Sequence, residues 1–229
     1  MTPFVNVLWP SAPPPTGIVF GDPVTTLYDS SVGSPFEVNI PPDLNGKLCL
    51  IALRHGRSPV HLSTPAGWES DLYGHSNSRP GLYWRACDGT EGATISIEAT
   101  SDGTTPTDGR VAALAYPVTG VATNEAAYLE TASIGSSDPP ALTPSWGSAE
   151  NRWLAFYSSR YSDWSVDTYP TNYVLLDALF NNPINGINGV GIVLAHRTLT
   201  AVTEDPSPFI LSGEVVTERS FTIALRPAT

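Results

Sequence analysis

The sequence predicts an all-β protein, built as a single antiparallel β-sandwich of jelly-roll-like architecture. Only 14% of the residues are charged, while 22 are proline and 19 are glycine, a composition typical of short strands joined by many turns. Several segments alternate apolar and polar residues with the period of a half-buried strand. Proline or glycine interrupts almost every window long enough for a helix. A chain of 229 residues also fits sandwiches that form one large domain.

The first half of the chain contains a series of segments with strand character. Residues 36–40 alternate apolar and polar side chains and end at a Pro-Pro pair, as expected for a half-buried strand. Residues 47–54 form a mostly apolar run after an Asn-Gly turn, so we expect a strand covered on both faces. Turns rich in Gly, Asp and Thr separate three further predicted strands, at 81–87, 94–100 and 111–118.

A proline-glycine corner lies among these strands, at residues 64–68, which read Thr-Pro-Ala-Gly-Trp. Proline fixes one backbone angle, and glycine permits a conformation that other residues avoid. Trp68 follows them with the largest apolar surface that a side chain can offer. The pattern predicts a bend that starts a strand and buries Trp68 beneath a sheet.

The second half of the chain repeats this order of elements. Pro170 and Tyr173 follow Pro65 and Trp68 at one constant interval, which predicts a second corner with Tyr173 buried in the place of Trp68. The other segments that correspond to strands of the first half are 151–157, 190–197 and 221–227.

This correspondence settles one ambiguity and predicts the architecture. Residues 151–157 also fit an amphipathic helix, but one repeat unit keeps one secondary structure, so we expect a strand. We expect pseudo-repeat halves at about 36–121 and 140–229, each a four-strand unit. Packed face to face, they would form one sandwich of eight or more strands.

Residues 1–26 are predicted to form an extended proline-rich arm, and residues 27–229 the sandwich domain. Prolines at this density favour a polyproline-like backbone. The arm carries too many apolar side chains for a disordered tail, so it should pack either on its own domain or on a neighbouring subunit. The arm residues that we expect to contact a partner are Phe4, Leu8, Trp9, Pro13, Pro14 and Pro15.

Charge and cysteine content argue against several classes of protein. The 11 Lys and Arg residues against 22 Asp and Glu give a net charge of −11, which disfavours binding to nucleic acid phosphates. Cys49 and Cys87 are too few for a disulfide framework, and we expect both to be buried thiols. The first residues lack the pattern of a signal peptide, and no apolar run is long enough to span a bilayer.

The sequence predicts neither a cofactor nor a metal site. Nucleophile elbows, phosphate loops, dinucleotide fingerprints and EF-hand loops do not occur in it. Three aspartates in Asp-Gly or similar turns could ligate Ca²⁺, but such residues are ordinary in turns. The histidines, which lack the spacings that bring two imidazoles onto one metal, are His55, His61, His75 and His196. The three aspartates that could ligate Ca²⁺ are Asp88, Asp102 and Asp108.

Two alternatives to a purely structural role come from loop residues. Glycoside hydrolysis needs two facing carboxylates. The available acids, which lie in turns and loops where carboxylates are common, include Glu69, Asp71, Asp163 and Asp167. A flat ring in a polar loop can stack on a sugar or fill a partner's pocket, or it can cover the edge of a core. The aromatic residues in such loops are Tyr73, Tyr161, Trp164 and Tyr169.

Residues 43–121 resemble a known group of proteins. In order, they contain a turn and an apolar strand, the Pro-Ala-Gly-Trp corner, the segment Leu-Tyr-Trp-Arg-Ala-Cys-Asp-Gly-Thr-Glu at 82–91, a Thr-rich strand and a small-residue strand that closes in Gly120-Val121. This succession resembles a β-sandwich of virion proteins in tailed bacteriophages. Similar domains occur there in tail fibre and tail tip proteins and in proteins that decorate the capsid.

The resemblance implies a nonenzymatic part of the virion surface that binds major capsid or tail proteins. The chain lacks the stalk of long fibre proteins, which favours a small decoration or cement subunit or a compact tail accessory protein. Such proteins commonly form homo-oligomers, so we expect one here, for example a trimer. The alternatives are a receptor- or carbohydrate-binding tail module that binds host surface glycans, and a hydrolase of surface polysaccharide.

Overall fold

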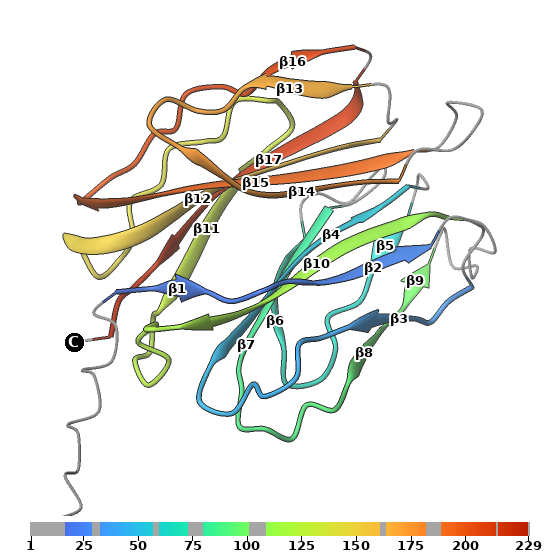
Figure 1. The fold of residues 1–229 in the computed structure, drawn as a ribbon, viewed down its shortest axis with the longest axis horizontal. Coiled ribbons are helices and arrows are strands. Elements are labelled where there is room, and N and C mark those ends of the chain that lie inside the picture. Colours follow the sequence, from blue (N-terminus) through green and yellow to red (C-terminus); the bar gives the residue numbers. More distant parts are fainter. Residues whose placement is uncertain are drawn as a thin grey trace, which may run out of the picture.

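The computed structural model describes residues 17–28, 33–56, 60–72, 80–100, 109–160, 164–181, 189–213 and 215–228. All regular elements in these ranges are β-strands, and they form an antiparallel sandwich, as the sequence predicts (Figure 1). In the part of the chain that the structure describes, no helix is long and apolar enough to cross a membrane.

The first half of the chain builds one large sheet, here called the first sheet. Its strands are, in order, β1 (Val19–Phe20), β10 (Val111–Thr119), β4 (Leu48–His55), β7 (Pro80–Ala86) and β6 (Glu69–Leu72), with β2 (Val24–Tyr28) also paired to β10. Two short strand pairs cover its outer face: β3 (Phe36–Asn39) with β8 (Thr94–Ile97), and β5 (His61–Leu62) with β9 (Ala99–Thr100). The pairings β2–β10, β3–β8 and β4–β7 are nested, as in a jelly roll.

The second half builds a second large sheet with the same succession of strands. Its order is β11 (Leu129–Ile134), β17 (Val216–Leu225), β12 (Ala149–Arg160), β15 (Val190–Ala201) and β14 (Val174–Asn181), which take the places of β2, β10, β4, β7 and β6. A short pair, β13 (Ser165–Thr168) with β16 (Ile210–Ser212), belongs to the same half. The halves therefore share one strand order, while their origin in one repeated sequence unit stays a prediction.

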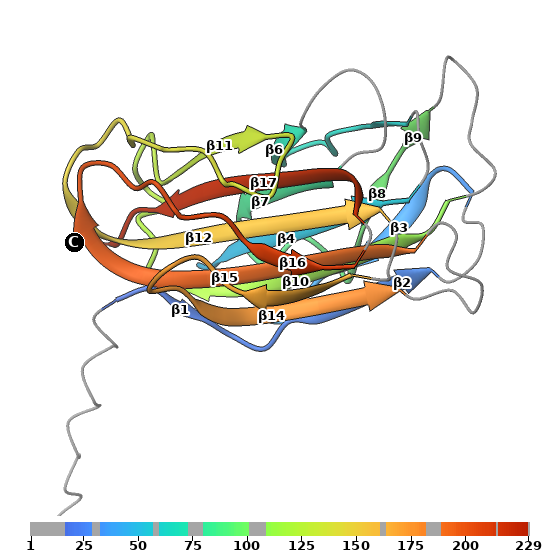
Figure 2. The same cartoon turned by 90° about the horizontal axis from the view of Figure 1, so that it is seen from above.

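The two large sheets pack face to face with their strand orders reversed. β10 lies over β14 and β15, while β4 lies over β15 and β12 (Figure 2). The sandwich therefore has two lateral edges. On one edge β1 and β2 of the first sheet accompany β14 of the second, and on the other β6 accompanies β11.

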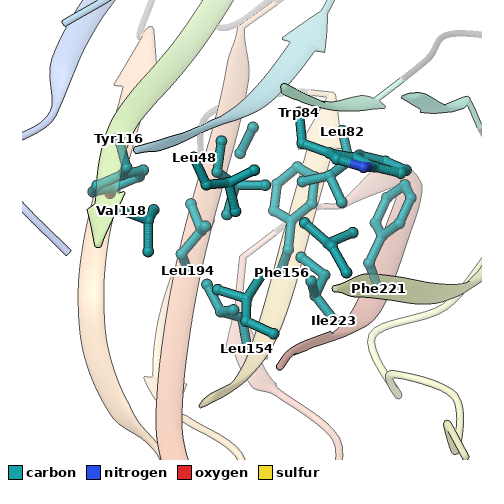
Figure 3. Packing of buried hydrophobic residues seen from close by; sticks show 14 of the residues in the cluster. Leu48, Leu82, Trp84, Tyr116, Val118, Leu154, Phe156, Leu194, Phe221 and Ile223 are labelled. Atoms are coloured by element: carbon teal, nitrogen blue, oxygen red, sulfur yellow. The ribbon is translucent and has the colours of Figure 1, made fainter. Parts of the chain in front are cut away.

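A continuous apolar core fills the space between the large sheets. Alternate side chains of β4, β7 and β10 point toward those of β12, β15 and β17 (Figure 3). At its centre the rings of Phe156 and Phe221 stack with their centroids 5.1 Å apart, and both side chains are fully buried. Leu48, Leu82 and Leu194 extend the same core across both halves.

The outer faces of the large sheets are also covered, so the described part of the molecule has four layers, in agreement with the expectation that the strand at 47–54 is covered on both faces. Trp68 and Ile51 belong to the outer core of the first half, and Trp153 and Tyr157 to that of the second. The reason is visible in β4, where all eight residues are buried. A strand that is apolar at consecutive positions needs a partner layer on each face.

Residues 17–26, the described part of the predicted arm, contain strands of the first sheet. β1 and most of β2 lie within this range, and both strands pair with β10, so the first sheet begins well before residue 27. Gly21 connects them and donates its N–H to the carbonyl oxygen of Pro117 (2.8 Å). The prolines and glycines around these strands hid them in the sequence. Part of the predicted arm thus packs on its own domain.

A buried arginine joins the two halves near the start of β17. Arg54 Nη2 donates hydrogen bonds to the carbonyl oxygen (2.6 Å) and Oγ1 (3.2 Å) of Thr217. Burial, together with the positive charge of Arg219, lowers the pKa of Arg54 to about 9. Tyr157 donates to Glu218 Oε2 (3.0 Å) in the second half. The junction is therefore apolar at its centre and hydrogen-bonded at this end.

Candidate protein-docking surface

Most of the residues that the sequence singled out for binding lie outside the described residues. These are Phe4, Leu8, Trp9, Pro13, Pro14, Pro15, Tyr73 and Tyr161. The structure therefore leaves their predicted contacts as predictions. It does place the remaining two aromatic residues, Trp164 and Tyr169.

Trp164 is a core residue and not a surface ring. Its side chain is only 4% exposed and meets the rings of Tyr157 and Phe180 edge to face, with centroids 4.9 and 5.0 Å away. Tyr169 is half-buried and packs against the same core. The expectation that Trp164 could stack on a sugar is wrong, because the layer formed by β13 and β16 encloses it. The glycan-binding alternative loses the residue on which it most depended.

The two predicted corners have the same geometry. In each, the backbone N–H of the aromatic residue donates to the carbonyl oxygen of the proline three residues before it, at 3.1 Å for Trp68 and 2.9 Å for Tyr173. The residue before the aromatic has a positive φ, 77° at Gly67 and 65° at Asn172. Trp68 is 8% exposed and Tyr173 is 6% exposed, so both are buried at the start of a strand as predicted.

An arginine and a glutamate hold each corner in place. Arg197 pairs with the buried Glu204, which also accepts a hydrogen bond from the Tyr173 hydroxyl (3.1 Å). Burial and the charge of Glu204 raise the pKa of Tyr173. At the first corner, Arg85 pairs with Glu91 at 3.4 Å. These ion pairs stabilise the fold at both corners.

The start of β1, at the beginning of the described chain, is held by both halves. Arg152 Nη2 donates to the carbonyl oxygen of Ile18 (2.7 Å), and Arg152 Nη1 lies 2.8 Å from Nδ1 of His196. Phe20 packs edge to face on Tyr116 of the first half and lies 6.2 Å from the His196 ring. Burial and the Arg152 charge lower the pKa of His196, so its neutral ring accepts the hydrogen bond.

A close backbone contact also fixes the start of β1, which we call the root of the N-terminal segment. Gly120 has a φ of 75°, and a Cβ there would stand 2.2 Å from the carbonyl oxygen of Gly17. Only glycine therefore fits at position 120. Ala228 donates its N–H to the Gly120 carbonyl oxygen (2.8 Å), so the described start and end of the chain meet beside the link between the halves. The point at which the N-terminal segment, residues 1–16, is attached therefore has a fixed position.

The lateral edge formed by β6 and β11 is closed by polar contacts. Tyr128 donates to Glu69 Oε1 (2.9 Å), and Thr131 donates to Asp71 Oδ2 (2.5 Å). Burial and the Glu69 carboxylate raise the pKa of the Tyr128 hydroxyl. Two carboxylates that the sequence offered for hydrolysis, Glu69 and Asp71, thus serve as a bridge between the sheets.

The opposite lateral edge, which we call the apolar edge, exposes several large apolar side chains. It consists of β1, β2 and β14. Four of the seven exposed large apolar side chains in the described ranges lie on it: Val19 (44%), Leu27 (43%), Val174 (58%) and Leu175 (45%). The other three, which lie apart from it, are Ile134, Val202 and Ile210. Because the strands of this one edge carry most of the exposed large apolar side chains described, the edge is the candidate surface for contact with another protein.

The strand register shows how the two edges differ. Glu69 on β6 pairs with Trp84 on β7, and Val174 on β14 pairs with His196 on β15. Because β14 and β15 hold the places of β6 and β7, Val174 is the counterpart of Glu69. One edge carries a hydrogen-bonded carboxylate where the other exposes a valine. Sequence reasoning missed this surface, although the interval between Trp68 and Tyr173 already aligned Glu69 with Val174.

The chemistry that this surface supports is association with an apolar or strand-forming segment. Within the described ranges, no group of three or more His, Cys, Asp or Glu side chains is placed to hold a metal ion. Cys49 and Cys87 are both buried as free thiols. Comparisons of the chain with protein-family models, with curated proteins and with solved structures found no match.

Proposed function

We propose that the protein is a nonenzymatic structural protein of a virion surface, which binds neighbouring virion proteins through its apolar edge and its N-terminal segment. The observation that carries the proposal is the difference between the two lateral edges. Equivalent strands form both, and polar contacts join the sheets at both, yet among the described residues the β6–β11 edge exposes one large apolar side chain, Ile134, while the other edge presents Leu27, Val174 and Leu175 to solvent. An exposed apolar edge strand invites pairing with another chain.

The magnitude of this apolar surface limits what it can do alone. The four exposed side chains of the apolar edge are each about half exposed. Covering them would contribute roughly 1 kcal/mol each, or about 4 kcal/mol together. Association costs about 4–15 kcal/mol in lost freedom of motion. The edge therefore needs a second contact element, and the apolar N-terminal segment, which is attached to β1 on this edge, supplies one.

The rest of the molecule suits a rigid building block. Charged groups at the second corner hold the fold, as the ion pair of Arg197 with the buried Glu204 shows. The central core joins both halves into one body. The placement of this body in a tailed-phage virion is supported by the resemblance of residues 43–121 to sandwiches of such virions, with capsid decoration or a tail accessory position as the two locations.

Binding to particles tests this proposal. Virions purified from a lysate that contains the protein should carry it in a fixed ratio to the major capsid or tail protein, and cryo-EM should show its sandwich on the outer surface. Added back to particles that lack it, the wild-type chain should bind, and Val174→Glu should bind at least tenfold more weakly. Ile134→Glu, which changes an equally apolar residue on the polar edge, is the matched control. Absence of the protein from virions would contradict the proposal.

A further inference from the structure

We propose that the apolar edge receives the N-terminal segment of a second copy of this chain, residues 4–9 adding to β14 as an extra strand. This names a partner for the surface described above and so rests on the proposed function, in that it takes the apolar edge as a protein-binding surface. The partner is identified by its chemistry and its length. Four observations support it.

The first observation is the state of β14. It is the last strand of the second sheet and pairs on one side with β15, while in the described part of the chain no strand pairs with its other side. Its first two residues, Val174 and Leu175, are 58% and 45% exposed. A peptide that joins a sheet edge gains main-chain hydrogen bonds from the strand, and pockets or apolar patches select its side chains.

The second observation is the composition of the N-terminal segment. Residues 4–9 read Phe-Val-Asn-Val-Leu-Trp, a run of aromatic and β-branched residues that favours extended strand structure. Residues 1–16 contain no charged side chain, although the whole chain has a net charge of −11. An uncharged segment can approach an acidic copy of the same chain without the repulsion that two acidic surfaces would experience.

The third observation is where this segment starts. Its root at Gly17 and Ile18 is fixed by Gly120 and by Arg152, on the same lateral edge as β14. Phe20 contacts His196, whose neighbour in the sheet is Val174. The segment therefore leaves one molecule beside the surface that it would cover on the next, an arrangement that lets identical copies join through identical contacts.

The fourth observation decides between the same molecule and a neighbouring one. Pro10 and the run Pro13 to Pro15 separate residues 4–9 from the root. Proline-rich chain is stiff and extended, and at about 3.1 Å per residue the stretch from Pro10 to Thr16 spans about 20 Å. The root already lies beside Val174 at the start of β14, so a straight spacer of this length carries residues 4–9 away from most of the β14 of the same molecule. A stiff spacer instead carries residues 4–9 to a neighbour.

A complementation experiment tests this directly. A chain that lacks residues 1–9 keeps the edge and loses the added strand, whereas full-length Val174→Glu keeps the strand and loses the edge. Each variant alone should be monomeric in size-exclusion chromatography with light scattering, at micromolar concentrations where the wild type self-associates. An equimolar mixture of the two should form a complex, because the arm of one variant fits the edge of the other.

The controls separate strand addition between copies from misfolding and from self-association through another surface. Val174 is an exposed residue, so Val174→Glu should keep the wild-type melting temperature, and Ile134→Glu should keep wild-type self-association. A monomeric wild type, self-association that survives loss of residues 1–9, or a mixture that stays monomeric would each overturn the proposal. Self-association is measured on the purified chain, so its failure leaves the particle-binding test of the proposed function independent.

Discussion

Phe156→Ala is the mutation that tests most sharply whether the two halves share one core. The Phe156 ring is fully buried and stacks on Phe221 across neighbouring strands at the centre of the molecule. Removing a buried phenylalanine ring costs about 3–5 kcal/mol through lost transfer free energy and the cavity that remains. That is a large part of the total stability of about 5–15 kcal/mol that a protein has. In a chain of this length it corresponds to a fall in melting temperature on the order of 10 °C.

The assay combines urea unfolding with hydrogen exchange read by mass spectrometry. Phe156 lies in the second half, but the core that it anchors also contains Leu48 and Leu114 of the first. Phe156→Ala should therefore lower the protection of amides in β4 and β10 as much as in β15 and β17. Ile210→Ala, at a residue 54% exposed, is the control and should change stability by less than about 0.5 kcal/mol. Loss of protection confined to the second half would refute a shared core.

Three further results are expected. Trp68→Ala should lower the free energy of unfolding by about 3–5 kcal/mol in urea titrations, because Trp68 is 8% exposed in the outer core of the first half; a change below about 1 kcal/mol would contradict its structural role. The lowered pKa of His196 means that its contribution to stability is present above its ordinary value of 6.5 and is lost as the pH falls through the folded value. Wild-type stability should thus drop more between pH 7 and pH 5 than that of His196→Gln, and equal drops would exclude this residue as the cause. Tyr128→Phe should cost about 1 kcal/mol by removing the hydrogen bond to Glu69, and an unchanged melting temperature would show that this bridge contributes nothing.

The sequence predicted the parts of the fold that depend on local pattern. The predicted strands at 47–54 and 151–157 correspond to β4 and β12. The first is a mostly apolar run with few other solutions, and its correspondence with the second indicates a strand there as well. The two corners were predictable for a similar reason. A proline followed by a residue that tolerates positive φ and then a large aromatic ring fixes both the bend and the buried anchor.

The parts that the sequence did not predict depend on tertiary contacts. β1 and β2 are flanked by proline and glycine and become strands because β10 offers them an edge to pair with. Trp164 lies in a polar stretch of sequence, yet strands distant in the chain enclose it, so local polarity suggested a surface residue. The apolar edge arises only when strands from the two halves lie side by side. Val174 and Leu27 carry no motif, and their shared exposure becomes visible only in the folded molecule.

Hydrogen exchange at the two lateral edges tests the central claim most directly, the claim that the apolar edge is the binding surface. The measurement compares the self-associated wild-type chain with monomeric Val174→Glu, at the amides of β14 and of β6. We predict that association slows exchange in β14 and leaves β6 unchanged, since β6 already faces β11 across the contacts of Glu69 and Asp71. Protection gained at β6 instead, with β14 exchanging at the same rate in both samples, would contradict the account.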